Sequence, residues 1–149
     1  MAIARGAGTE ILRAHHFEDI DSTNQILIVG VQHHIYTVLS VIVHTKVIQA
    51  AGNVIELAIT GYDSKAGTTA QEITFLRQAM NANETFVWND KIVFNGFEPT
   101  DFTGPLDDAT KQNAVADQGS SVAQYLACQS THASDNYEMC ITFIDQNNA

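Results

Sequence analysis

The sequence predicts an all-β protein: a single antiparallel β-sandwich or jelly roll of about eight strands, preceded by a flexible N-terminal arm. Two observations carry this prediction. Val, Ile, Leu and Thr are concentrated in short segments, and β-branched side chains pack better on a pleated sheet than in a helix. Turn residues such as Gly, Asn and Asp separate these segments, and no long helical pattern interrupts them.

The stretch 25–45 is expected to form the centre of the sandwich. It contains two predicted strands, Gln25–Val31 and Ile35–Thr45. Strict alternation in the second strand places Leu39 and Ile42 on opposite faces, and both faces are largely apolar, so we expect a central strand that is covered on both sides. A membrane span is excluded because the longest apolar run is far shorter than the ~20 residues that a spanning helix needs.

The other predicted strands follow from alternation and from turn residues between them. They are Thr9–Phe17, Val54–Thr60, Gln71–Met80, Glu84–Trp88, Lys91–Asn95, Val122–Gln129 and Tyr137–Ile144. Val54–Thr60 alternates cleanly, which predicts one buried and one wet face. Gln71–Met80 also fits a helix, and a strand is favoured because its neighbours are strands. Asn89 and Asp90 tolerate positive φ, so a tight hairpin-like turn is expected there.

One interior is expected to hold large apolar residues from several of these strands. They are Leu39, Val41, Ile55, Leu57, Ile59, Phe86, Trp88, Ile141 and Phe143. We expect Trp88 to be a buried anchor of this core, whose loss would cost roughly 3–5 kcal/mol.

The chain is predicted to be one domain of 149 residues, a common domain size. Residues 1–8, rich in Ala and Gly, form the arm, and 9–149 form the sandwich with a long loop at 97–120. Leu106–Ala116 within that loop could hold a short helix capped by an Asp. Long connections in compact domains are usually functional or interface elements.

Charge composition excludes two classes of partner. Seven basic residues stand against 17 acidic ones, a net charge of −10, and the basic residues are scattered singly. Direct nucleic-acid binding and docking on an anionic membrane both require clustered Lys and Arg, so neither is expected. The N-terminus lacks the apolar core of a signal peptide, so we expect an unsecreted protein made in a cytoplasm.

No catalytic, cofactor or metal site is predicted. The six histidines are His15, His16, His33, His34, His44 and His132. Adjacent strand residues point to opposite faces, so neither His pair easily serves one ion, and the H-x-H strand of a metal-binding jelly-roll enzyme is absent. Nucleophile-elbow and nucleotide-loop motifs are absent too, and the acidic residues at 101–117 lack Ca²⁺-loop spacing. Cys128 and Cys140 are expected to be free, buried thiols.

The segment Glu84–Gly96, with the sequence ETFVWNDKIVFNG, resembles a hairpin motif of small virion proteins of tailed phages. In those proteins a strand of the type Y-x-V-x-S-I-x-V packs beside it, and here that strand is YTVLSVIV, Tyr36–Val43. The whole chain, from MAIARGAGTE to TFIDQNNA, also resembles short virion proteins of marine and cyanobacterial phages. These motifs indicate a sandwich rather than a site.

The resemblance implies a non-enzymatic structural subunit, made in the host cytoplasm and located in the virion. The first expectation is a head decoration (cement) protein, a trimer or dimer that binds the major capsid protein or other virion proteins. Its alternatives are a neck, collar or tail appendage or fibre subunit, and a carbohydrate-binding module for host attachment.

The arm and the long loop are expected at subunit interfaces. Both have too few apolar residues to pack densely on their own domain, and ordering flexible backbone costs about 1–2 kcal/mol per residue. The candidate interface residues are Arg5, Phe97, Phe102, Leu106 and Val115.

Overall fold

The structure is a computed structural model, and it describes residues 8–62, 69–97, 104–116 and 123–147. Within these ranges the elements are β1 (Thr9–Ile20), β2 (Gln25–Val29), β3 (His34–Val47), β4 (Val54–Tyr62), β5 (Ala70–Ala79), β6 (Thr85–Trp88), β7 (Ile92–Asn95), α1 (Ala109–Ala116), β8 (Tyr125–Ser130) and β9 (Asn136–Asn147). Each predicted strand is present, Gln71–Met80 included, and the all-β prediction is confirmed.

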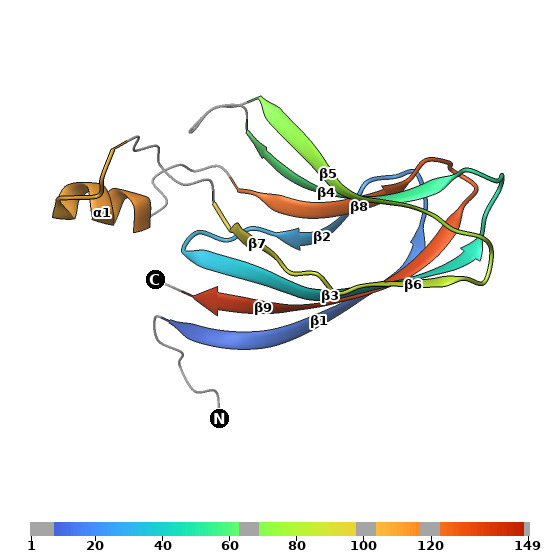
Figure 1. Ribbon diagram of the computed structural model, residues 1–149, viewed down its shortest axis with the longest axis horizontal. Helices are drawn as coiled ribbons and strands as arrows, with labels where there is room; N and C mark the ends of the chain where they lie inside the picture. The colour runs from blue at the N-terminus through green and yellow to red at the C-terminus, as the bar shows by residue number, and fades with distance from the viewer. Residues whose placement is uncertain (1–7, 63–68, 98–103, 117–122, 148–149) are drawn as a thin grey trace.

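The strands form two antiparallel sheets that stack face to face, with α1 beside one end of the sandwich (Figure 1). One sheet has the order β1-β9-β3-β6, with β7 also paired to β3, and the other has the order β2-β8-β4-β5. Counted as one interrupted strand, β6 and β7 reduce the described strands to eight, four in each sheet, and their order is that of a jelly roll.

The predicted hairpin turn at Asn89 and Asp90 is wrong. Both β6 and β7 pair with β3, with Trp88 opposite Val41 and Ile92 opposite Val38. The chain therefore continues along one edge of β3 instead of reversing. Neither Asn89 nor Asp90 adopts positive φ, and the interruption lies opposite an irregularity in β3 itself.

Because of that irregularity, the predicted assignment of β3 side chains to the two faces of the sheet is wrong. The register between β3 and β9 shifts between Val38 and Ser40. Val38 is buried before the shift and Val41 after it, whereas Leu39 is only half-buried. A β-bulge of this kind moves every later side chain to the other face. The outer face is not covered, because Ile42 is 41% exposed.

The core lies between the sheets and contains most of the predicted residues. Val41, Ile55, Leu57, Ile141 and Phe143 are fully buried. Ile59, Phe86 and Trp88 are partly buried and pack against this core. The prediction that Leu39 belongs to the core is wrong, because Leu39 is only half-buried and lies outside this cluster. Tyr36 and Tyr137, which the sequence did not single out, are the largest fully buried side chains.

The predicted wet face of β4 is also partly wrong. Ala58 and Thr60 are 6% and 3% exposed. β4 is an inner strand between β8 and β5, so small side chains on it lie low between larger neighbours. β4 keeps a continuous register with β8, so Ala58 and Thr60 keep their predicted direction, and the shift opposite Leu57 and Ala58 places an extra residue, Phe75, in β5.

Close backbone contacts join the two sheets at one end of the sandwich. The Gly30 amide donates to the Gln124 carbonyl at 2.8 Å, and the Gln124 amide donates to the Gly96 carbonyl at 2.8 Å. A Cβ on Gly30 or Gly96 would overlap backbone oxygen atoms of the neighbouring segment. Only glycine fits where these backbones cross.

A buried carboxylate joins the loops at the opposite end. Asp135, 3% exposed, accepts hydrogen bonds from Ser130 Oγ at 2.5 Å, from the Gln49 amide at 2.8 Å and from Asn53 Nδ2 at 3.0 Å. Burial by itself would raise the pKa of Asp135, but these hydrogen bonds outweigh it and lower the pKa. The β3–β4 and β8–β9 loops are thereby held together.

The predicted short helix is present as α1. The Lys111 amide donates to Asp108 Oδ1 at 2.9 Å, which is an N-terminal cap. No helix in the described part of the chain is long and apolar enough to cross a membrane.

Candidate functional site

The predicted interface residues occupy separate places, and two lie outside the described residues. Arg5 and Phe102 are those two. Phe97 is half-buried and pairs through its backbone with Ala123. Leu106 is 43% exposed ahead of α1, and Val115 lies within that helix. Their assignment to an interface stays a prediction.

A different set of exposed aliphatic side chains stands out on the two opposite edges of the sandwich. The β1–β2 side carries Ile11, Leu12, Ile26, Val29 and Val31, which are 41–68% exposed. The β5–β7 side carries Ile73, Val87 and Val93, which are 55–72% exposed. Large aliphatic residues gathered at sheet edges indicate a protein–protein contact surface.

The longest edge strands, β1 and β5, each carry a bulge but neither Pro nor Lys. Among the strands that the structure describes, β1 pairs with β9 alone and β5 with β4 alone. Neither strand contains Pro or Lys, although they have 12 and 10 residues. Natural sheets commonly protect such edges with Pro, Lys or very short strands. These two edges are therefore suited to pairing with another strand.

Each side also has a groove between the sheets. On the β1–β2 side the groove has a volume of about 410 Å³, and the Arg13 guanidinium lies within it, 5.3 Å from the Phe143 ring centre. Arg13 Nη1 donates to Asp145 Oδ2 at 2.9 Å, and His34 Nδ1 lies 2.5 Å from Asp145 Oδ1. Arg13 thus compensates the buried carboxylate, and His34 contacts it from a second direction.

Tyr36 completes the floor of this groove. Burial and the nearby Asp145 carboxylate raise the pKa of Tyr36 to about 12, so the phenol is neutral at physiological pH. The Arg13–Asp145 ion pair and the rings of Tyr36 and Phe143, 6.1 Å apart, line the groove between β1 and β2. The charge of Arg13 is thus already paired within the chain.

The groove on the β5–β7 side is more apolar. It has a volume of about 440 Å³ and is lined by Ile59, Ile73, Phe75, Ile92, Val93, Phe94, Asn95 and Gln124. The rings of Phe75 and Trp88 are 5.4 Å apart and join the two sheets beside it. Trp88 is thus a half-buried edge residue rather than the central anchor that we predicted.

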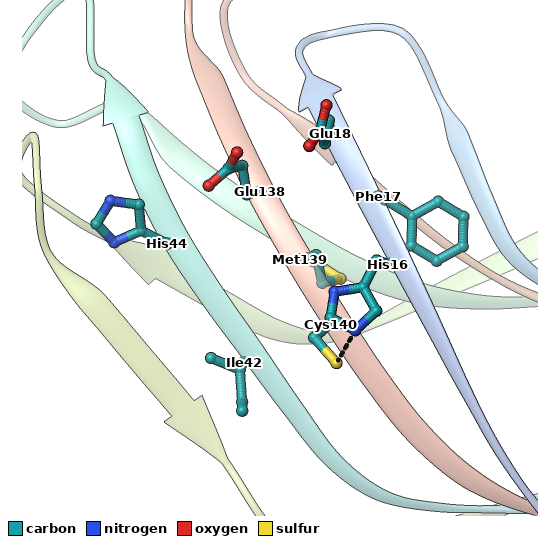
Figure 2. Close-up of a pocket in the computed structure, with 8 residues that line it drawn as sticks. All are labelled: His16, Phe17, Glu18, Ile42, His44, Glu138, Met139 and Cys140. Atoms are coloured by element: carbon teal, nitrogen blue, oxygen red, sulfur yellow. Dashed lines mark hydrogen bonds between the residues drawn. The ribbon is translucent and has the colours of Figure 1, made fainter.

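A third, shallower hollow lies on the outer face of the β1-β9-β3 sheet and has a volume of about 290 Å³ (Figure 2). Cys140 Sγ lies 3.4 Å from His16 Nε2 across paired strands. Figure 2 shows Glu138 between His44 and Glu18, away from this pair. Glu138 binds Lys46 Nζ at 2.5 Å and His44 Nδ1 contacts Thr85 Oγ1 at 2.9 Å.

The outer hollow does not form a metal or nucleophile site as it stands. No group of three or more His, Cys, Asp or Glu residues among those described could hold a metal ion. A thiol–imidazole pair needs a third group to orient the base and donors for an oxyanion. Here Glu138 already has a partner on β3, Lys46, and His44 has a partner on β6, Thr85.

The histidines are spread over the sandwich, as the strand geometry predicted. His15 and His16 point to opposite faces, with His15 Nδ1 3.3 Å from the Leu27 carbonyl in the β1–β2 groove. His33 adopts positive φ in the turn before β3, and His132 Nδ1 accepts from the Ser134 amide at 3.0 Å.

Both cysteines are free thiols, as predicted, but only one is buried. Cys128 lies in the core, where burial raises its pKa to about 12. Cys140 is half-exposed beside His16. The sequence could not predict this pairing, because the two residues are 124 positions apart. The sequence shows the exposed aliphatic residues as apolar positions on predicted strands. It does not show that they are exposed, because that depends on which strands lie at the sheet edges.

No family model matches this chain, and no curated protein matches it. Among solved structures, the chain is similar to one described as "Bacillus endospore appendages form a novel family of disulfide-linked pili", with a TM-score of 0.43 and 12% identity over 100% of this chain and 97% of that chain. It is also similar to the T13 IBDV viral particle, with a TM-score of 0.39 and 8% identity over 99% of this chain and 37% of that chain. Values this low are not evidence of a shared function.

Proposed function

We propose that this chain is a non-enzymatic structural subunit of a phage virion that assembles with copies of itself. One observation carries the proposal: exposed aliphatic side chains line two long edges of a jelly roll, and the edge strands β1 and β5 contain neither Pro nor Lys. A monomer gains nothing from such edges, because unpaired backbone and apolar surface favour association. The full-length resemblance to short phage virion proteins supports the virion as the setting.

Within the virion, the head surface is the place that we propose. A decoration protein stabilises a shell by burying surface across neighbouring capsomers, and this binding favours the assembled state by linkage. The net charge of −10 suits an outward position, away from packaged DNA. The major capsid protein is then the main partner, and neck or tail positions are the alternatives.

Copy number and self-association test the proposal separately. Purified particles should contain the chain in hundreds of copies by quantitative mass spectrometry, and the purified chain should be oligomeric by light scattering. A small multiple of three, five, six or twelve would place it at the neck or tail. Absence from particles together with a strictly monomeric chain would contradict the structural role.

The N-terminal arm has its own test. Deleting residues 1–8 should leave the circular dichroism spectrum of the domain unchanged and weaken oligomerisation or particle binding. Phe102→Ser should act in the same way. If both variants bind particles with unchanged occupancy, the interface assignment of these two segments is wrong.

A further inference from the structure

We infer that copies of this chain join head to tail, with the β1–β2 side of one copy against the β5–β7 side of the next. The inference rests on the proposed function as a self-assembling subunit and adds which surfaces meet. The two sides differ in strand order and in groove lining. A two-fold dimer through one side would leave the exposed aliphatic residues of the other side uncovered, whereas a head-to-tail contact covers both.

Strand direction fits this arrangement in both sheets. The path β1-β9-β3-β6 and the path β2-β8-β4-β5 each have four strands, and all neighbouring pairs are antiparallel. The two end strands of each sheet therefore run in opposite directions. A copy placed sideways in the same orientation brings β1 beside β6 and β7, and β2 beside β5, so the antiparallel order continues through both sheets.

The register places exposed aliphatic residues at the same level on the two edges. Leu12 pairs with Ile144, Ile144 with Thr37, and Thr37 with Val93, so these four form one row across the sheet. Leu12 is 68% and Val93 is 59% exposed at the two ends of that row. Side-by-side copies thus place Leu12 of one against Val93 of the next.

The second sheet also has an exposed aliphatic residue at each edge, but the two are not in one row. Ile73, 72% exposed, lies in one row with Ile59, Leu126 and Ile28, and Ile28 is buried. Val29, 61% exposed, is the next residue of β2 and therefore points to the opposite face. The match in height is thus carried by the Leu12–Val93 row, and Val29 and Ile73 add exposed apolar surface on the second sheet.

The area is sufficient for a specific but modest contact. A strand of the length of β1 spans about 40 Å, and two sheets about 10 Å apart with their side chains give an edge about 15–20 Å thick. Each copy would bury on the order of 600 Å², and the total of about 1,200 Å² is at the lower end of specific interfaces. Because sheets twist, successive copies are rotated, so the contact closes into a ring or continues as a filament.

Cysteine cross-linking tests this contact directly. In a Cys140→Ser background, Leu12→Cys and Val93→Cys are prepared as separate proteins and oxidised alone and mixed. The expected result is a disulfide-linked dimer only in the mixture, and a ladder of dimers, trimers and larger species from the chain that carries both changes. Ile42→Cys, 41% exposed on an inner strand, is the matched control and should not cross-link.

A charge exchange provides a second readout that does not depend on oxidation. Leu12→Lys and Val93→Glu should each lower self-association at least tenfold, and the chain with both changes should regain most of it. Efficient self-cross-linking of Leu12→Cys alone, or cross-linking of Ile42→Cys at the same rate, would overturn the head-to-tail contact. If particles contain the chain while the Leu12/Val93 pair fails to cross-link, this contact is wrong and the structural role stands.

Discussion

Removing the Asp135 carboxylate should destabilise the fold, because it accepts three hydrogen bonds, two from the β3–β4 loop and one from the end of β8. Asp135→Ala leaves the buried Ser130 hydroxyl and the Gln49 amide without their acceptor. Each buried donor left unpaired costs about 1–3 kcal/mol, so we expect a loss of about 3 kcal/mol. Asp135→Asn keeps one acceptor oxygen and should cost about 2 kcal/mol. Against a typical stability of about 5–15 kcal/mol, both losses are measurable by urea unfolding.

The same substitution predicts a pH dependence with a definite sign. The pKa of Asp135 is lowered in the folded state, so its contribution to the free energy of unfolding is fully present above the unfolded pKa of about 3.9. The contribution is lost as the pH falls through the lower folded pKa. The stability difference between the natural chain and Asp135→Asn should therefore be constant from about pH 7 to pH 5 and shrink below about pH 4.

An exposed carboxylate provides the control for this experiment. Asp90 is exposed, and Asp90→Asn should change the free energy of unfolding by less than about 0.5 kcal/mol. Unfolding is followed by circular dichroism at low protein concentration, since the pI is about 4.7. If Asp135→Asn is as mild as Asp90→Asn, or if the stability difference persists unchanged at pH 3, the loop-joining role of Asp135 is refuted.

Three further predictions concern packing and thiol chemistry. Gly96→Ala should lower the free energy of unfolding by about 3 kcal/mol, because the added Cβ would overlap the backbone at Val31. Gly104→Ala is the control, since nothing lies within 4 Å of its new Cβ, and thermal unfolding should be nearly unchanged. Trp88→Ala should lower the free energy of unfolding by about 2 kcal/mol, below the range for fully buried aromatic residues. Acrylamide should partly quench the fluorescence of Trp88 in the native chain. Complete protection from the quencher would contradict the half-buried position of Trp88. With a thiol reagent the native chain should show one reactive group, Cys140, and the unfolded chain two; a fast reaction at Cys128 would contradict its burial.

Much of this fold could be predicted from the sequence, because the signals concerned are local. Alternation and β-branched residues located each strand. The short helix and its Asp cap also followed from neighbouring residues. The prediction that the chain has no catalytic site also rested on local signals, namely short motifs with fixed spacing.

Other features were decided only by tertiary structure. The bulge at Leu39 arises from pairing with β9, so alternation alone assigned the later residues of β3 to the wrong faces. The burial of Ala58 and Thr60 depends on the neighbouring strands β8 and β5. The continuous course of β6 and β7 depends on their shared partner β3, which overrides the turn preference of Asn and Asp. The two exposed edges exist only once the strand order is known. Strand order is set by packing and hydrogen bonding between segments far apart in the sequence. Local sequence patterns therefore predict each strand but not which strands become the edges of a sheet.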